Sequence, residues 1–269
     1  MLLGDNLRGA ISRSPFANDR DMLIVVADGG FTSVEQLQSD GCHLWWAVMD
    51  AVDAGALQRC QAWLSDYELE RLGRFAFERD QRVYLLAHAM LRGVLSRYFG
   101  QRPEAWRIEA TGGGKPAIHS PILPQRVTFN LSHSQGIALC GVAIGREVGV
   151  DVEDMERAVE FAALAKRYFS ASEAAEVQAR SGDEQRRRFF EYWTLKEAVL
   201  KGEGAGIVNG LAGFAVQFGA DGNIEATGAT GARWELHLAK LENRYALAAA
   251  LERRGTRVTP RIREWRPPA

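Results

Sequence analysis

Alternating apolar and polar residues mark residues 148–153 as a strand with two different faces. Valines occupy positions 148, 150 and 152, and Gly149, Asp151 and Glu153 stand between them. Because successive side chains of a strand point to opposite faces, the valines face a core while Asp151 and Glu153 share the other face. The pattern therefore predicts two carboxylates side by side on one surface of a sheet.

A helical pattern follows over about residues 183–201. Trp193, Glu197 and Lys201 are spaced four residues apart, which places their side chains roughly on one face of a helix. The glycine-rich segment 202–206 is typical of a helix end. Where this helix meets the strand 148–153, three carboxylates and a lysine come together.

The remaining periodicity predicts further helices and strands. Residues 53–99 have helical spacing, with an N-cap region at 64–66, and Ser170 with Glu173 matches a capping box. Segments 43–49, 127–130, 214–218 and 234–238 are rich in strand formers. Segment 137–143 predicts a hairpin with 148–153 through a tight turn at 145–147. The alanine-rich segment 245–251 fits a strand or a helix.

This order of elements predicts an α+β fold of two similar lobes. Each lobe is expected to hold a small antiparallel sheet packed with helices, the two related by a pseudo-twofold axis, with the active site in the cleft between them. We expect an N-terminal extension at residues 1–40, an N-terminal lobe at 41–144 and a C-terminal lobe at 145–269. No internal sequence repeat supports the duplication directly.

Composition narrows the class of protein. The chain has 269 residues, 46% of them hydrophobic and 25% charged, and a formal net charge of −1. Such a balance gives no reason to expect binding to nucleic acid or to a membrane surface. Three widely spaced cysteines without a CxxC pattern favour neither a disulfide framework nor a zinc site, and indicate a reducing cytoplasm. The sequence shows no signal peptide and no apolar run of membrane-spanning length.

The predicted carboxylate cluster fits a hard divalent cation that holds a diphosphate, with a lysine left for a charged leaving group. Each part also has a purely structural interpretation. Asp151 and Glu153 taken alone describe a solvated strand edge, and Glu197 with Lys201 describes an ordinary surface pair on a helix. The functional interpretation depends on further motifs that occur with them.

Four motifs occur in order, and together they resemble a known family. They are Gly-Lys-Pro at 114–116, Phe-Asn-Leu-Ser-His-Ser at 129–134, Val-Gly-Val-Asp-Val-Glu at 148–153 and Trp-Thr-Leu-Lys-Glu-Ala-Val-Leu-Lys at 193–201. Together they resemble the signature blocks of the 4′-phosphopantetheinyl transferases, in the larger surfactin-type (Sfp-type) class. The resemblance spans about residues 44–250. It implies a monomer with two lobes in one chain, about twice the length of the small holo-acyl-carrier-protein synthases.

The resemblance also implies a reaction, a metal and partners. Such enzymes move the phosphopantetheine arm of coenzyme A to a serine hydroxyl of an apo acyl or peptidyl carrier protein, and release adenosine 3′,5′-bisphosphate. Asp151, Glu153 and Glu197 would ligate Mg²⁺, which suits oxygen ligands. Glu197 is our choice for the general base. Lys201 would stabilise the leaving phosphate.

The resemblance assigns coenzyme A contacts with less detail. His133 and Ser132 would bind phosphate oxygens, and Lys115 and Pro116 belong to a glycine-rich loop that approaches the nucleotide. Lys196 would bind a phosphate or pair locally. Basic residues for the 3′-phosphate are expected at Arg71 and Arg82. Tyr84 departs from the small hydroxyl residue expected near the adenosine.

Two other functions remain open at this point. One is a Mg²⁺-dependent hydrolase of nucleotide diphosphates, and the other is a non-catalytic module that binds coenzyme A or a carrier protein. The sequence does not select among fatty-acid, polyketide and nonribosomal-peptide carriers as acceptor. The triple arginine at 186–188 is a candidate contact for an acidic carrier or a solvated helix face.

Overall fold

We analysed the fold in a computed structural model, which describes residues 11–12, 24–25, 33–110, 115–204, 211–220 and 223–268. Thr111 and the glycines at 112–114, part of the predicted phosphate loop, lie outside the described residues, as do residues 205–210 of the segment after the helix. No helix among the described residues is both long and apolar enough to cross a membrane.

The first large sheet has five strands and belongs mostly to the N-terminal part of the chain. Strands β3, β7 and β6 are antiparallel neighbours, and β13 lies parallel between β2 and β3. In spatial order the strands are β2 (Ile24–Val25), β13 (Arg261–Glu264), β3 (Cys42–Val48), β7 (Ile137–Ile144) and β6 (Val127–Ser134).

The second large sheet has four antiparallel strands. Their spatial order is β1 (Ile11–Ser12), β11 (Trp234–Leu241), β12 (Tyr245–Glu252) and β8 (Val148–Asp154). Two small hairpins complete the strands: β4 (Arg107–Ala110) pairs with β5 (Pro116–Ser120), and β9 (Ala215–Phe218) pairs with β10 (Ile224–Thr227).

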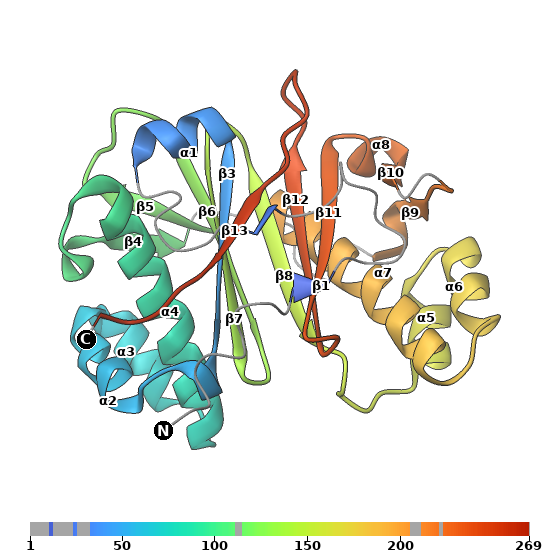
Figure 1. Cartoon of the computed structure of the whole chain (residues 1–269), viewed down its shortest axis with the longest axis horizontal. Helices are drawn as coiled ribbons and strands as arrows, with labels where there is room; N and C mark the ends of the chain where they lie inside the picture. Colours follow the sequence, from blue (N-terminus) through green and yellow to red (C-terminus); the bar gives the residue numbers. More distant parts are fainter. Residues whose placement is uncertain are drawn as a thin grey trace.

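The two large sheets pack face to face, and helices cover their outer faces (Figure 1). One apolar cluster lies between the sheets and contains Leu44, Val150 and Leu247. A second joins the first sheet to α4 (Glu78–Phe99), and a third joins the second sheet to α7 (Gly182–Glu203). The predicted α+β fold of two lobes, each a sheet with helices, is confirmed.

Shorter helices surround these layers. They are α1 (Val34–Asp40), α2 (Ala54–Arg59), α3 (Asp66–Gly73), α5 (Phe161–Tyr168), α6 (Ala171–Gln178) and α8 (Gly228–Gly231), with 3-10 turns at Met49–Ala51, Cys60–Trp63, Pro103–Ala105 and Leu211–Gly213. Ser65 and Ser170 each form a full capping box, which confirms both predicted helix starts.

The predicted hairpin between β7 and β8 is wrong. The turn exists, with Gly145 at a φ of 73°, but β7 and β8 enter different sheets and do not pair. Both strands are apolar on the faces that meet between the sheets, so a sharp turn lets one pack over the other. The alanine-rich segment 245–251 is a strand, β12, and not a helix.

The C-terminal strand crosses the predicted lobe boundary. We expected residues 145–269 to form the second lobe, but β13 pairs with β3 of the first sheet. The Trp265 side chain is buried in the first lobe's core, and its backbone N–H donates to the carbonyl of Trp46 at 2.7 Å. The rest of the predicted division stays a prediction.

Strands β6 and β8 meet along their edges through side chains. Asn130 Oδ1 accepts a hydrogen bond from the backbone N–H of Val150, at 2.8 Å. Ser132 Oγ and Ser134 Oγ accept from the N–H groups of residues 152 and 154, both at 3.3 Å. Polar side chains at every second position of β6 thus take the place of a neighbouring strand's carbonyls.

Candidate active site

Strand β8 presents Asp151 and Glu153 to helix α7. Both side chains are largely buried, and Val148, Val150 and Val152 face the core between the sheets. The alternation predicted from the sequence therefore places the two carboxylates on one face, as expected. A buried carboxylate is costly unless it is paired, hydrogen-bonded or bound to a metal.

Glycines let α7 approach β8 closely enough to bring Glu197 and Lys201 to these carboxylates. A Cβ atom at Gly149 would lie 2.0 Å from the carbonyl oxygen of Ala198 and 2.4 Å from the N atom of Gly202. A Cβ at Gly202 would lie 2.5 Å from the Trp234 ring. Larger residues at either position would push α7 away, so these glycines set the geometry of the site.

Lys201, Asp151 and Ser132 form a triangle of hydrogen bonds at the centre of the site. Lys201 Nζ lies 2.6 Å from Asp151 Oδ1 and 2.8 Å from Ser132 Oγ. Ser132 Oγ donates in turn to Asp151 Oδ1 at 2.9 Å. The structure thus brings together residues of β6, β8 and α7, as the sequence motifs predict.

Glu153 is held by groups from three directions. Trp193 Nε1 donates to its Oε1 at 3.0 Å, and Ser134 Oγ donates to its Oε2 at 3.3 Å. The Arg157 guanidinium lies 3.6 Å from the same Oε2. Ser134, Trp193 and Arg157 were not among the predicted site residues. Ser134 has a sequence signal, since it continues the alternation of Asn130 and Ser132.

Two buried carboxylate oxygens of the site accept no hydrogen bond. They are Asp151 Oδ2 and Glu197 Oε1, which have no partner in the part of the chain that the structure describes. No group of three acidic, His or Cys side chains in the described ranges is arranged to enclose a metal. The two free oxygens nevertheless fit a hard cation, because Mg²⁺ is commonly held by one or two carboxylates and completes its shell with water and phosphate.

The carboxylates repel one another, and this shows in their pKa values. Burial, together with the charges of Asp151 and Glu153, raises the pKa of Glu197 to about 7. Burial and the Asp151 charge raise the pKa of Glu153 as well. Strong upward shifts in clustered carboxylates are typical of sites that act on protons or bind cations.

His133 lies on β6 between Ser132 and Ser134, with its side chain still in contact with solvent. Although the ring is solvent-accessible, lost hydration lowers its pKa, and the charges of His88 and Lys201 lower the pKa further. The imidazole is therefore neutral at pH 7, with one N–H to donate.

The other predicted coenzyme A residues lie at differing places. Lys115 Nζ bonds Glu147 Oε2 at 2.7 Å and the carbonyls of Val148 and Gly202, so it joins the start of β8 to the end of α7. Pro116 begins β5 and is exposed. Arg71 on α3 and Arg82 on α4 are exposed.

Tyr84 is buried and its ring stacks on His88, with 4.0 Å between ring centroids. His88 Nδ1 lies 2.8 Å from Glu68 Oε1, and Arg92 also bonds Glu68. The residue that departs from the expected pattern therefore has a structural place in the first lobe.

The assignment of Lys196 to a coenzyme A phosphate is wrong. Its side chain is fully buried and its Nζ lies 2.8 and 2.9 Å from the two carboxylate oxygens of Glu173. Lys196 also donates to the carbonyl of Phe214. Adjacent helix residues point about 100° apart, so Lys196 faces the core beside α6 while Glu197 faces β8. The alternative of a local pair is the correct one.

Comparisons with known proteins give the class. A family model described as the 4′-phosphopantetheinyl transferase superfamily matches residues 147–250, and one described as 4′-phosphopantetheinyl transferase, N-terminal, matches residues 53–143. The chain is 36% identical over 171 residues to the 4′-phosphopantetheinyl transferase HetI of Nostoc sp.. The aligned region covers 64% of this chain and 72% of HetI. The chain belongs to the 4′-phosphopantetheinyl transferase superfamily.

Further relatives indicate the class within that superfamily. The transferase Sfp of Bacillus subtilis is 32% identical over 168 residues, 62% of this chain and 72% of Sfp. A phosphopantetheinyl transferase of Thraustochytrium sp. is 30% identical over 222 residues, 77% of this chain and 75% of that protein. The resemblance to the surfactin-type class is confirmed.

Proposed function

We propose that this chain transfers the 4′-phosphopantetheine arm of coenzyme A to a serine hydroxyl of an apo carrier protein. The observation that carries the proposal is the combination of a fixed cation, Lys201, with two buried oxygens, on Asp151 and Glu197, that accept no hydrogen bond from any described residue. A diphosphate needs both positive charge and a metal-binding surface, and this set offers both. The residues of the site and the membership in the superfamily both support this chemistry.

Asp151 and Glu197 are the residues that would hold Mg²⁺, with Glu153 beside them. When bound, the cation would neutralise the diphosphate charge. Trp193 and Ser134 fix the orientation of Glu153, so that its carboxylate stays near Asp151 and Glu197. A carboxylate oriented in this way needs no rearrangement when the substrate arrives.

Glu197 is the proposed base. The serine oxygen attacks the β-phosphorus of coenzyme A, the bond from that phosphorus to the bridging oxygen breaks, and adenosine 3′,5′-bisphosphate leaves. The serine proton goes to a Glu197 oxygen. A carboxyl whose pKa lies at about 7 can accept a proton at neutral pH and release it afterwards.

Lys201 and His133 would stabilise the phosphates. Lys201 is held by Asp151 and Ser132, so its charge has a fixed position beside these two residues. His133 would donate its N–H to a phosphate oxygen. Lys115, Pro116, Arg71 and Arg82 are proposed contacts for the nucleotide, Ser132 for a phosphate, and Lys196 is not among them.

The finer assignments belong to the same proposal. We expect the acceptor to be an acyl carrier protein, as for a holo-acyl-carrier-protein synthase, or a peptidyl carrier domain in fatty-acid, polyketide or nonribosomal-peptide synthesis. Magnesium as the metal, a monomeric state and a cytoplasmic location are further expectations from the resemblance. Each can be measured separately.

The first test is intact mass spectrometry of an apo carrier protein incubated with this chain, coenzyme A and Mg²⁺. We expect the carrier to gain the mass of one phosphopantetheine arm, and the gain to disappear in EDTA and in Asp151→Ala. Cleavage of coenzyme A without any carrier would indicate the hydrolase. Binding of coenzyme A without cleavage or transfer, across several carrier types, would indicate the binding module.

A further inference from the structure

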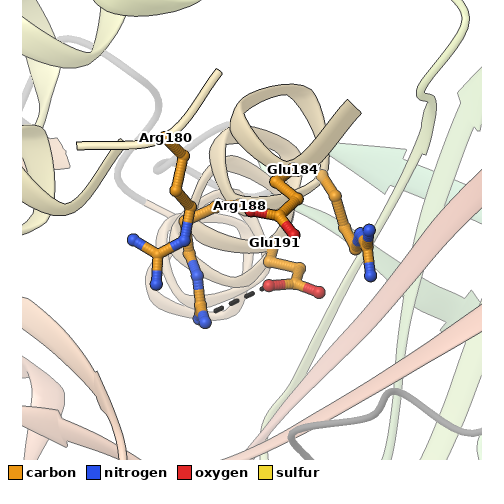
Figure 2. A pocket seen from close by; sticks show the side chains of 5 residues that line it. Arg180, Glu184, Arg188 and Glu191 are labelled. Atoms are coloured by element: carbon orange, nitrogen blue, oxygen red, sulfur yellow. Dashed lines mark ion pairs between the residues drawn. The ribbon is translucent and has the colours of Figure 1, made fainter. Parts of the chain in front are cut away.

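A cavity of about 160 Å³ at the start of α7 contains charges of both signs. It is lined by Arg180, Glu184, Arg187, Arg188 and Glu191. The dashed line in Figure 2 joins Arg188 to Glu191, whose nearest charged atoms lie 3.4 Å apart. Arg180 pairs with Glu176 at 2.9 Å. Two of the arginines are thus already matched by carboxylates of the protein, and the cavity gives no sign of a ligand.

Strand β6 differs, because it carries polar side chains of the candidate active site on both of its faces. Ser132 turns to β8, where its Oγ bonds Asp151. Since side chains alternate along a strand, His133 shares the opposite face with Phe129 and Leu131. Those two residues pack in the apolar cluster that joins this sheet to α4. His133 therefore lies on the side of β6 that α4 covers.

His88, on α4, lies close enough to His133 for its charge to act on that ring. Burial lowers the pKa of His133 most, and the charge of His88 has the next largest effect. Lys201 acts in the same direction, whereas the carboxylates of Asp80 and Asp151 oppose it with smaller effects. The two imidazoles are thus neighbours across the contact between α4 and β6.

The ring of His88 is held from two sides. Its Nδ1 lies 2.8 Å from Glu68 Oε1, and its face stacks on the Tyr84 ring with 4.0 Å between centroids. Glu68 is itself fixed, because Arg92 donates to its Oε2 from Nε at 3.0 Å and from NH2 at 2.6 Å. A carboxylate beside Nδ1 makes this nitrogen the protonated one and sets the orientation of the ring.

The other ring nitrogen of His88, Nε2, is open. It makes no hydrogen bond with any residue in the described part of the chain. The side chain is 21% exposed, so a ligand can reach it. An imidazole between a carboxylate and a phosphate carries a proton on both nitrogens, and donates a charge-assisted hydrogen bond to the phosphate.

A third basic side chain borders the same ring stack. Arg71, on α3, is exposed, and its charge lowers the pKa of the Tyr84 hydroxyl, although burial raises that pKa to about 12. Two imidazoles and a guanidinium, from α4, β6 and α3, are donors suited to the oxygens of a phosphate group.

We propose that His88 is a further binding residue for coenzyme A, and that its Nε2–H donates to a phosphate oxygen beside His133. This assignment rests on the proposed function, which supplies the ligand. Glu68 is the positioning residue, because it orients the His88 ring. None of the four sequence motifs contains His88.

The test is isothermal titration with coenzyme A in the presence of Mg²⁺. His88→Gln should raise the Kd about tenfold, because a charge-assisted hydrogen bond is lost. The kcat at saturating coenzyme A should change by less than about twofold, as for a group that binds the ground state and the transition state equally. His119→Gln is the matched control, since His119 also lies beside a carboxylate, 3.9 Å from Glu109, but on the hairpin of β4 and β5. It should keep the wild-type Kd.

The same titration with 3′-dephospho-coenzyme A identifies the phosphate. Weaker binding of this compound to His88→Gln than to the wild type would place His88 at the diphosphate. Equal binding of this compound by the two proteins would place His88 at the 3′-phosphate. Either result supports the proposal, provided that coenzyme A itself binds more weakly to the variant. An unchanged Kd for coenzyme A in a folded His88→Gln would overturn it.

A measurement on the unchanged protein keeps the proposal testable if the variant does not fold. In ¹H–¹⁵N spectra of the histidine side chains, coenzyme A should shift the ring signals of His88 and His133 and leave those of His119 in place. A shift of His133 without a shift of His88 would overturn this assignment alone. A wild type that binds no coenzyme A would overturn the proposed function as well, so the two failures are distinguishable.

Discussion

On one side of α7, Lys196 is fully buried and bonded to both oxygens of Glu173. On the other side, the next residue, Glu197, is buried with one oxygen that accepts no hydrogen bond among the described residues. Both residues belong to the same sequence motif. The Lys196–Glu173 pair, with its hydrogen bonds made, stabilises the second lobe, whereas the open oxygen of Glu197 is available to a ligand. Completeness of hydrogen bonding thus separates structural from functional charges more clearly than motif membership does.

The largest loss of transfer rate should come from changes at the carboxylates of the candidate active site. Glu197→Gln and Asp151→Asn should each lower the transfer rate about 10³-fold, or about 4 kcal/mol of activation free energy. Stability to urea should not fall in Glu197→Gln, because this change removes a negative charge from a crowded cluster. A steady-state transfer assay and a urea unfolding curve measure the two. Glu225→Gln, at an exposed carboxylate on β10, is the control, and a near-normal rate in Glu197→Gln would contradict the assignment.

Lys196, on the other side of α7, should show the opposite result: a change there should lower stability and leave coenzyme A binding unchanged. Lys196→Met leaves Glu173 charged and buried, which should cost about 3 kcal/mol of unfolding free energy. The KM for coenzyme A of the folded enzyme should not change. Lys166→Met, at an exposed position of α5, should be neutral in both measurements. An increased KM with unchanged stability would return Lys196 to the coenzyme A site.

The contact between α7 and β8 can be loosened directly. Gly149→Ala places a Cβ where only 2.0 Å separates it from the Ala198 carbonyl oxygen, so α7 must shift. We expect about 2 kcal/mol of lost stability and a large loss of transfer rate in the protein that still folds. Gly73→Ala, where no atom lies within 4 Å of the added Cβ, should leave both unchanged. Full activity in Gly149→Ala would show that the site tolerates movement of α7.

As pH rises, the stability contributed by Glu197 should change in the opposite direction to the stability contributed by Glu68. The folded-state pKa of Glu197 is raised from 4.5 to about 7, so the unfolded chain loses this proton first, and metal-free stability should fall as pH rises from 4.5 to 7. We expect about 2 kcal/mol from urea unfolding at pH 5 and pH 8. Glu197→Gln should flatten this dependence, and so should added Mg²⁺.

Glu68 supplies the opposite case. Burial alone would raise its pKa, but hydrogen bonds and charges from His88 and Arg92 lower it from 4.5 to about 2. Its stabilisation is complete above pH 4.5 and is lost as pH falls toward 2. Glu68→Gln should therefore weaken the dependence of stability on pH below pH 4.5 and leave the dependence near neutral pH unchanged. Equal pH profiles of the two Gln variants would contradict the distinction between the two carboxylates.

The strand and helix that carry the site were predictable because their signals are local. Alternation of Val148, Val150 and Val152 with polar residues fixes the face of Asp151, and four-residue spacing fixes the face of Glu197. The direction of Lys196 was not predictable. Its neighbours in the motif, Glu197 and Lys201, lie in the site. The partner of Lys196 is Glu173 on α6, and only the packing of α6 against α7 brings the two together.

Other features depend on tertiary contacts that no local pattern contains. The turn at Gly145 is readable, but whether β7 and β8 pair or separate depends on what packs on each face. Trp193 looks like an ordinary core residue in sequence, and only its indole N–H, aimed at Glu153, gives it a role in the site.

Strand β13 has a consequence for how the protein is made. It is synthesised after every other described element, yet it lies between β2 and β3 in the first sheet. Until it emerges from the ribosome, one edge of β3 displays unpaired backbone groups, and the first core lacks the Trp265 indole. An exposed strand edge invites pairing with other chains. The native pairing of the first sheet can therefore be completed only after the last strand of the described chain has been made.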